Sequence, residues 1–276
     1  MSKQPQGVKM NNFKNYLSSF DFLNLQGLRQ NRGGSYILGW SHRLTGLLLL
    51  AYALLHINTL STLSSPEVFT RKAEMFSGPF FVFLEWLLAI PVIFHCLNGG
   101  RLLVYELFTT RHDEKLIGWM GTLSIVYMLL LGYLMFLGNQ EVSPLFFWLT
   151  ALVLSLIVSC PVWQKISGVN GSIFWKLQRL SGAFLFVLVP AHMLFMHLNP
   201  TVGRDVQVIT ERLNQPLIVA LDTGLLVCIL YHGGYGLIGI LKDYLIDQRT
   251  IKLAMAVVIV TLVLFGLQGT GLAGAL

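Results

Sequence analysis

Four histidines lie in apolar stretches of this chain as two copies of one pattern, about half a chain apart. The first copy contains His56 and His95, and the second contains His192 and His232. The interval is 136 residues between His56 and His192, and 137 residues between His95 and His232. Neutral imidazole is the usual axial ligand of haem iron, and bis-imidazole ligation needs two facing helices at matched depth. The duplication therefore predicts a membrane electron-transfer subunit that binds two stacked haems of the b type.

A short run that precedes the first histidine of each copy repeats as well. Residues 42–46 read His-Arg-Leu-Thr-Gly, and residues 178–182 read Gln-Arg-Leu-Ser-Gly. Thirteen residues separate the arginine of each run from the next intramembrane histidine, His56 or His192. His197 is a rival ligand, but it lies five residues beyond His192 and points roughly 140° away around the helix. The matched spacing favours His192.

Two of the histidines are expected near the cytoplasmic side. His95 and His232 each precede an acidic residue by 11 positions, at Glu106 and Asp243. At the rise of an α-helix, this inner pair lies roughly 16 Å from the cytoplasmic helix ends. The other two histidines form the outer pair, expected roughly 10 to 15 Å further along the membrane normal. A lone intramembrane histidine more often makes an interhelical hydrogen bond, but four at matched positions favour ligation.

Glycines and cationic side chains gather near the expected ligands. A porphyrin face needs close backbone approach, which glycine permits, although small residues also serve ordinary helix packing. The glycines are Gly46, Gly99, Gly100, Gly182, Gly233, Gly234 and Gly236. Four further residues are expected on the side of the haem propionates, namely His42, Arg43, Arg101 and Arg179. For the arginines, snorkelling to lipid phosphate is the alternative.

Composition excludes several other classes of protein. The chain has 276 residues, of which 54% are hydrophobic and 12% charged, and its mean hydropathy is +0.66. Soluble domains carry about 25% charged residues. No hydrophilic stretch is long enough for a soluble catalytic domain, so chemistry on water-soluble substrates must take place on a partner protein. The three cysteines lack the spacing of a disulfide framework, a zinc site, an iron–sulfur cluster or a c-type haem.

Seven apolar runs are long enough to cross a bilayer as helices of roughly 20 residues. They lie at about 36–62, 79–106, 116–137, 143–163, 170–198, 215–243 and 252–272. These runs predict an all-α, polytopic transmembrane helical bundle. We expect two three-helix haem-binding repeats, 36–137 and 170–276, linked by a joining transmembrane helix within 138–169. The joining helix lacks histidine and returns the chain to the side from which the second repeat enters.

The basic residues are distributed unevenly over the two sides of the membrane. With a cytoplasmic N-terminus, fifteen of the nineteen Lys and Arg residues fall on the cytoplasmic side. The other four are Arg71, Lys72, Arg204 and Arg212. This bias obeys the positive-inside rule, so the net charge of +6 reflects topology and gives no support for nucleic-acid binding. The sequence therefore predicts a multi-pass protein surrounded by lipid in a bacterial cytoplasmic membrane.

The N-terminal segment, residues 1–35, is basic and has aromatic and leucine residues at helical spacing. This pattern is typical of an interfacial segment or of an arm that docks a soluble partner. A partly disordered tail is the alternative. We expect a cytoplasmic N-terminal arm.

At these residues the chain resembles the membrane-anchor subunits of succinate:quinone oxidoreductase (complex II) and of fumarate reductase. Spans 1 and 2 are similar to the cytochrome b-556 anchor in the run 42–46, in Leu-Ser-Ser-Pro-Glu at 63–67, in His95 and in Gly100-Arg101. Spans 6 and 7 resemble the second, hydrophobic anchor in His232, Gly236 and Asp243-Tyr244. The chain looks like a fusion of both anchor subunits.

The resemblance implies that His95 and His232 ligate the inner haem, and that the outer histidine pair places the chain with the dihaem members. It implies a pocket for ubiquinone or menaquinone formed by Tyr244, Asp243 and Arg43. The chain departs from the family pattern where some members carry a quinone-binding serine, because Gly39 stands there and leaves Ser41 as a substitute. A histidine of those members is likewise replaced by Leu102.

The same resemblance implies partners and a reaction. An iron–sulfur subunit and a flavoprotein subunit are expected on the cytoplasmic side, and electrons pass between succinate or fumarate and membrane quinone, as in the tricarboxylic acid cycle. The direction of the reaction, the quinone type and the oligomeric state stay open. A quinone pocket at the opposite face, near Glu67, Glu74 or Glu141, is an alternative.

Two other functions are compatible with the histidine pattern. The first is the haem b anchor of another quinone-linked enzyme, such as a hydrogenase or formate dehydrogenase. The second is a proton-coupled transporter that uses histidines as a relay, since duplicated helix units also occur in transporters. The basic N-terminal arm and the cytoplasmic charge favour a cytoplasmic partner, and an optical spectrum separates a cytochrome from a transporter.

Overall fold

The structure is a computed structural model that describes residues 34–108, 113–138 and 140–274. In these residues the chain is helical, and seven helices are long and apolar enough to cross a membrane. They are α3 (Gly34–Leu60), α5 (Pro79–Phe108), α6 (Asp113–Leu137), α7 (Pro144–Ser167), α8 (Ile173–Leu198), α11 (Pro216–Tyr244) and α12 (Gln248–Gly274). The predicted all-α polytopic bundle is therefore confirmed, whereas residues 1–33 of the predicted N-terminal arm lie outside the described residues.

Local capping explains where several of these helices begin. The Ser172 hydroxyl accepts a hydrogen bond from the Trp175 amide at 3.2 Å, so α8 starts three residues later than predicted. The Asp247 carboxylate accepts hydrogen bonds from the amide and the hydroxyl of Thr250, both at 2.8 Å. These bonds lower the pKa of Asp247 and start α12 four residues before the predicted position.

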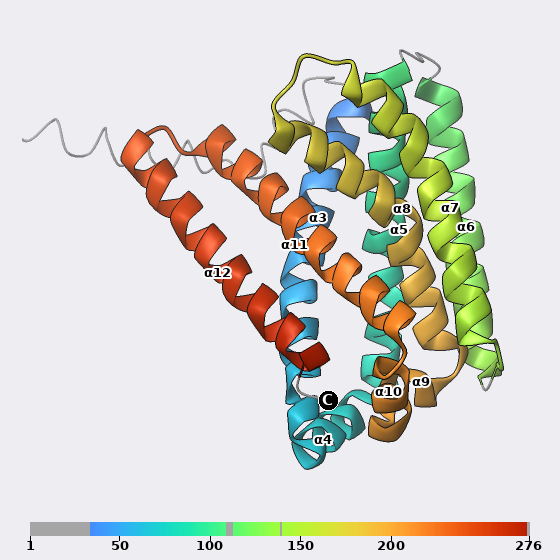
Figure 1. Cartoon of the computed structure of the whole chain (residues 1–276). Helices are drawn as coiled ribbons and strands as arrows, with labels where there is room; N and C mark the ends of the chain where they lie inside the picture. Colours follow the sequence, from blue (N-terminus) through green and yellow to red (C-terminus); the bar gives the residue numbers. More distant parts are fainter. Residues whose placement is uncertain (1–33, 109–112, 139, 275–276) are drawn as a thin grey trace, which may run out of the picture.

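Short helices that the sequence reading did not predict lie at one end of the bundle. They are η1 (Ser61–Ser64), α4 (Pro66–Phe76), α9 (Pro200–Arg204) and α10 (Val206–Leu213). Figure 1 shows α4, α9 and α10 together at the lower end, and we call the opposite end, where α3 begins, the upper end. Leu63, Phe69 and Ile209 form a small buried cluster. This cluster joins the connection between α3 and α5 to the connection between α8 and α11.

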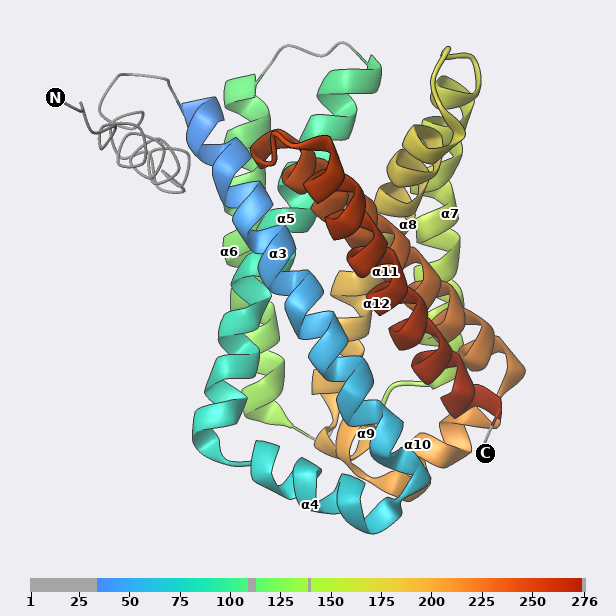
Figure 2. The same cartoon turned by 90° about the vertical axis from the view of Figure 1, so that its left-hand side faces the viewer.

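Four long helices form the centre of the bundle. The first helices of the two predicted repeats, α3 and α8, each pack against both second helices, α5 and α11. The outer helices follow the same rule, because α6 packs against α5 and α8, and α12 packs against α11 and α3. Figure 2 shows α3 and α12 side by side on the face turned towards the viewer. The helix contacts are therefore the same when α3 is replaced by α8, α5 by α11 and α6 by α12. In the central four helices, α3 lies diagonally opposite α8, and α5 lies diagonally opposite α11.

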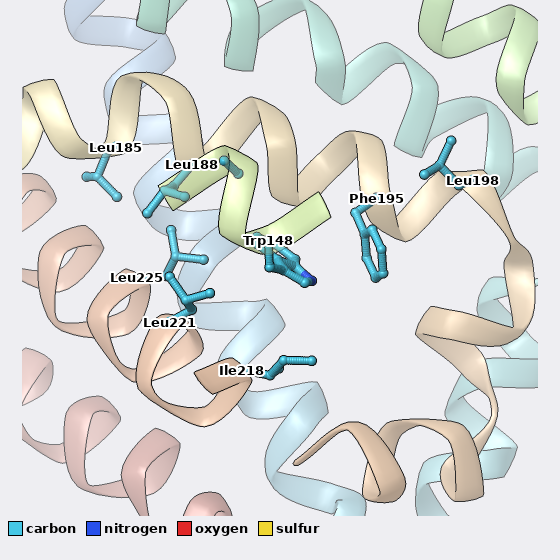
Figure 3. Close-up of a cluster of buried hydrophobic side chains, with 9 residues drawn as sticks. Trp148, Leu185, Leu188, Phe195, Leu198, Ile218, Leu221 and Leu225 are labelled. Carbon is cyan, nitrogen blue, oxygen red and sulfur yellow. The ribbon is translucent and has the colours of Figure 1, made fainter. Parts of the chain in front are cut away.

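The joining helix α7 lies along α8. The largest buried cluster links α7, α8 and α11, and Figure 3 shows Trp148 between side chains from the other two helices. Trp148 is only 1% exposed. The Ser155 hydroxyl on α7 also donates to the Phe184 carbonyl on α8 at 2.9 Å. This packing holds α8, which carries one of the predicted ligands, in a fixed position.

Candidate cofactor-binding site

The structure brings the four predicted histidine ligands together as two facing pairs. His95 on α5 and His232 on α11 have ring centres 6.3 Å apart and ring planes at 90°. His56 on α3 and His192 on α8 have ring centres 6.2 Å apart and planes at 85°. Each pair therefore spans one diagonal of the central four helices.

The ring separations are close to what two imidazoles on one metal ion require. Each metal–nitrogen bond is about 2 Å long and each nitrogen lies roughly 1 Å from its ring centre, which together give about 6 Å between ring centres. The observed separations of 6.3 and 6.2 Å are both close to this value. The spacing of each pair thus fits two imidazole ligands on one metal ion.

Both inner histidines are held through Nδ1 by equivalent groups of the two repeats. His95 Nδ1 lies 3.1 Å from the His42 carbonyl and 3.3 Å from the Thr45 hydroxyl. His232 Nδ1 lies 3.5 Å from the Ser181 hydroxyl. A carbonyl only accepts, so His95 Nδ1 donates its proton and Nε2 keeps a lone pair for a metal. Such a second hydrogen bond is the usual way in which a metal-binding histidine is oriented.

The hydroxyl protons are already used by the backbone. Thr45 Oγ1 donates to the Ser41 carbonyl at 2.8 Å, and Ser181 Oγ donates to the Gln178 carbonyl at 3.1 Å. Each hydroxyl is therefore left to accept a hydrogen bond from the neighbouring imidazole. The repeated Thr-Gly and Ser-Gly steps place this acceptor at the same position in both repeats.

The glycine of each step is required by close approach of the ring. A Cβ atom on Gly46 would lie 2.8 Å from His95 Cε1, and one on Gly182 would lie 3.0 Å from His232 Cε1. The other predicted glycines differ in their surroundings. Gly100 lies against Phe186 and Gly233 against Leu50, whereas a Cβ on Gly236 would meet no atom within 4 Å.

A cavity of about 720 Å³ includes the inner pair and extends both to Asp243 at the upper end and to Ala53 on the side of the outer pair. This volume is within the usual range for small-molecule and cofactor sites, about 300 to 1,000 Å³. Its lining includes the predicted residues His42, His95, His232, Gly46, Gly182 and Gly236. His42 stacks on His95 with ring centres 3.9 Å apart. The cavity wall thus carries both predicted inner ligands, His95 and His232.

Two arginine–carboxylate pairs line the upper part of this cavity. Arg43 Nη2 lies 2.7 Å from Asp243 Oδ2, and Arg179 binds Glu106 through two hydrogen bonds of 2.9 Å. The two pairs occupy equivalent positions, and each joins one repeat to the other. Arg101 is buried and donates to Asn98 Oδ1 at 2.9 Å, and it is not among the described residues that line the cavity.

The residues predicted to bind quinone are adjacent at the upper end. Arg43 Nη1 donates to the Tyr244 hydroxyl at 3.4 Å, beside the ion pair with Asp243. Trp40 covers this group, with its ring 6.0 Å from that of Tyr244 and 5.9 Å from the Arg43 guanidinium. Among the described residues, no hydrogen bond joins the Ser41 hydroxyl to these three side chains. Ser41 contributes its carbonyl to Thr45 instead.

Aromatic rings surround the outer pair. Tyr52 stacks on His56 with ring centres 5.9 Å apart, and the Trp148 ring lies 6.0 Å from that of His192. His192 Nδ1 is buried without a hydrogen-bond partner among the described residues. His197 is engaged elsewhere, since Nδ1 contacts the Met193 carbonyl at 2.7 Å and Nε2 lies 3.6 Å from Glu85. The structure therefore places His192, and not His197, opposite His56.

Two acidic residues near the outer pair were missed by the sequence reading. Glu85 pairs with Arg204 at 3.3 Å, and Asp222 pairs with Arg212 at 3.7 Å. Glu85 lies ten residues before His95, and Asp222 lies ten residues before His232. The equal ten-residue spacing before His95 and His232, like the equal eleven-residue spacing to Glu106 and Asp243, could have identified them from the sequence.

A family model described as the succinate dehydrogenase/fumarate reductase transmembrane subunit matches residues 35–132 and 159–267. The chain is therefore a multi-pass membrane anchor subunit by class. It belongs to the succinate dehydrogenase/fumarate reductase transmembrane subunit family, whose members associate with the soluble catalytic subunits of the complex. No curated protein and no solved structure matches the chain.

Proposed function

We propose that this chain is the dihaem cytochrome b anchor of a succinate dehydrogenase or fumarate reductase, and that it passes electrons between an iron–sulfur subunit and membrane quinone. The observation that carries the proposal is the pair of facing imidazoles on each diagonal of one helix bundle, at 6.3 and 6.2 Å. Family membership supports the anchor role, and the duplicated pairs supply the reason for two haems.

The protein residues hold, orient and shield the cofactors. His95 and His232 supply the inner ligands, with their Nδ1 atoms fixed by the neighbouring first helices. His56 and His192 supply the outer ligands within an aromatic shell. Haem b, when bound, supplies one-electron redox chemistry whose potential depends on the axial ligands, burial and nearby charge.

The quinone site is proposed at the upper end, at Tyr244, Asp243 and Arg43, with Ser41 beside them. Reduction of a quinone takes two electrons and two protons, and negative charge develops on its oxygens. The Tyr244 phenol and the Arg43 guanidinium can donate hydrogen bonds to such an oxygen. Asp243 is half exposed, with 51% of its side chain accessible, and can relay protons from water.

Topology follows from the charges. Most basic residues of the described chain lie at the upper end, so this end is assigned to the cytoplasm of a bacterial inner membrane. The iron–sulfur and flavoprotein subunits then bind there, next to the inner histidine pair. The family match leaves out residues 133–158, a range that covers much of the joining helix α7. This gap between the two matched segments supports a fusion of two three-helix anchor subunits.

A reduced-minus-oxidised optical spectrum with a pyridine haemochrome assay tests the function directly. The purified chain should contain two haems b, and it should co-purify with subunits that oxidise succinate or reduce fumarate. A chain without haem would exclude the cytochrome. Two haems in a complex with a hydrogenase or formate dehydrogenase would keep the cytochrome and reject the succinate or fumarate partner.

A further inference from the structure

Charged side chains at the lower end repeat the arrangement of those at the upper end. The second helix of each repeat carries a carboxylate ten residues before its histidine and another eleven residues after it. The upper carboxylates, Glu106 and Asp243, pair with arginines of first helices. The lower ones, Glu85 and Asp222, pair with Arg204 and Arg212 from the connection between α8 and α11.

Arg212 is the most deeply placed arginine of these four pairs. Its side chain is 13% exposed, compared with 26% to 41% for the other three arginines. It lies on α10 and turns into the bundle, where Nη1 contacts the Met196 sulfur at 3.3 Å and Nη2 lies 3.7 Å from Asp222. Met196 is one helical turn after His192, so the two side chains share a face of α8. The guanidinium is thus directed towards the outer histidine pair.

The hydrogen bonding of Arg212 is incomplete. Its Nε atom is buried without a partner among the described residues, and an unpaired buried donor of this kind is costly. A carboxylate is the natural partner for a guanidinium, which donates from Nε and an Nη atom together. Asp222, at 3.7 Å from Nη2, leaves Nε for a second carboxylate.

The charge of Arg212 is permanent and acts on both outer ligands. Burial lowers the pKa of Arg212 and Asp222 counteracts this, but a guanidinium keeps its proton in proteins. Arg212 lies close enough to His56 and His192 to interact electrostatically with each. Glu85 also acts on His56, and Arg204 and His197 lie beside that carboxylate. Among these groups, only Arg212 acts as a cation on both outer imidazoles.

We propose that Arg212 is a positioning residue for the outer haem, which binds a propionate carboxylate through its unpartnered Nε and favours the reduced state of the iron. This inference rests on the proposed dihaem function. Reduction removes one positive charge from the haem, so a fixed cation in a poorly solvated site stabilises the reduced form. Asp222 opposes this effect and limits its size.

Redox titration of the purified complex, followed by the absorbance of each haem, tests this role. In Arg212→Gln the ratio of reduced to oxidised outer haem at a fixed potential should fall about tenfold, as expected for one charge acting over roughly 10 Å at an effective dielectric of about 20. That change corresponds to about 59 mV for a one-electron couple. Asp222→Asn should raise the ratio, and the double variant should return close to wild type.

Matched variants separate this role from a structural one. Arg212→Lys keeps the charge and should restore most of the ratio, and Arg71→Gln on exposed α4 should leave both haems unchanged. Unchanged outer ratios, or shifts of the same sign in Arg212→Gln and Asp222→Asn, overturn the inference. If Arg212→Gln does not assemble, Asp222→Asn decides alone. A higher ratio of reduced to oxidised outer haem supports the inference, and a lower or unchanged ratio overturns it. A wild-type complex with one haem instead refutes the dihaem proposal, and this inference with it.

Discussion

Around the inner pair, His95 and His232, backbone and hydroxyl groups hold each Nδ1, and a cavity of about 720 Å³ opens beside the rings. Around the outer pair, His56 and His192, aromatic rings pack against the imidazoles and one Nδ1 has no partner among the described residues. Yet the ring separations differ by only 0.1 Å, at 6.3 and 6.2 Å.

The same ligand spacing is therefore produced in two ways. The inner rings are positioned by polar contacts that the repeat conserves, Thr45 in one half and Ser181 in the other. The outer rings are positioned by packing, and the arginines near them, Arg204 and Arg212, both come from the connection between α8 and α11. We therefore expect equivalent substitutions in the two repeats to have similar effects on the inner site. Substitutions near the outer site should have no such counterpart in the other repeat.

The largest expected effect is loss of one haem. Replacing His95 or His232 by Ala should remove the inner haem, and replacing His56 or His192 should remove the outer one, because each iron needs both of its ligands. Haem content should fall from two to one per chain in the pyridine haemochrome assay, with the spectrum of the other haem retained. Loss of both haems in every variant would show that the two sites do not assemble independently.

A smaller but still large effect is expected from filling the space beside an inner ring. In Gly46→Ala the new methyl group would lie 2.8 Å from His95 Cε1, which forces the ring or its helix to move. We expect weaker binding of the inner haem and no change in the outer one, measured as haem content after dilution. Gly39→Ala is a matched control on the same helix, since its Cβ would meet no atom within 4 Å. Equal losses in both variants would argue against a ring-specific effect.

The third effect concerns the upper end of the bundle, where Arg43 and Asp243 line the inner cavity and Tyr244 contacts Arg43. Tyr244→Phe removes a phenol that contacts Arg43 at 3.4 Å. We expect quinone reductase activity to fall about tenfold, less than the roughly 100-fold lost with a buried oxyanion donor, because this site is open to water. Both haems, and succinate oxidation by an artificial acceptor, should be unchanged. Normal quinone turnover here, together with loss on replacing Glu67, Glu74 or Glu141, would move the site to the lower face.

The histidine pairs and the seven spans were predictable because both depend on regular spacing. The intervals of 136 and 137 residues placed His56 with His192 and His95 with His232, and apolar runs of about 20 residues mark spans directly. Single arginines were harder to place. Arg101 and Arg179 bind Asn98 and Glu106, and no local pattern shows which of several polar partners a long side chain reaches.

The lower end could not be predicted from periodicity. Helices α9 and α10 are short and capped by Asn199 and Asp205, and their role depends on contacts with distant spans. Arg212 entered the sequence reading only as one of four basic residues on the far side of the membrane. Its burial follows from the path of the connection and from Asp222 on the next span, which composition does not reveal.

The smallest expected effect tests whether the inner site is symmetric. Thr45→Val removes the hydroxyl 3.3 Å from His95 Nδ1, while the His42 carbonyl remains at 3.1 Å. Losing a hydrogen-bond partner of a metal-binding histidine often lowers metal affinity about 10- to 100-fold, but the carbonyl retained here should limit the loss to a few-fold. Ser181→Ala should give a similarly small loss at His232, because the Ser181 hydroxyl lies 3.5 Å from His232 Nδ1 and this long contact is weak. Inner-haem dissociation rates measure both effects. A loss in one variant only would show that the two ligands are held unequally despite the repeat, and additive losses in the double variant would show that the two imidazoles are oriented independently.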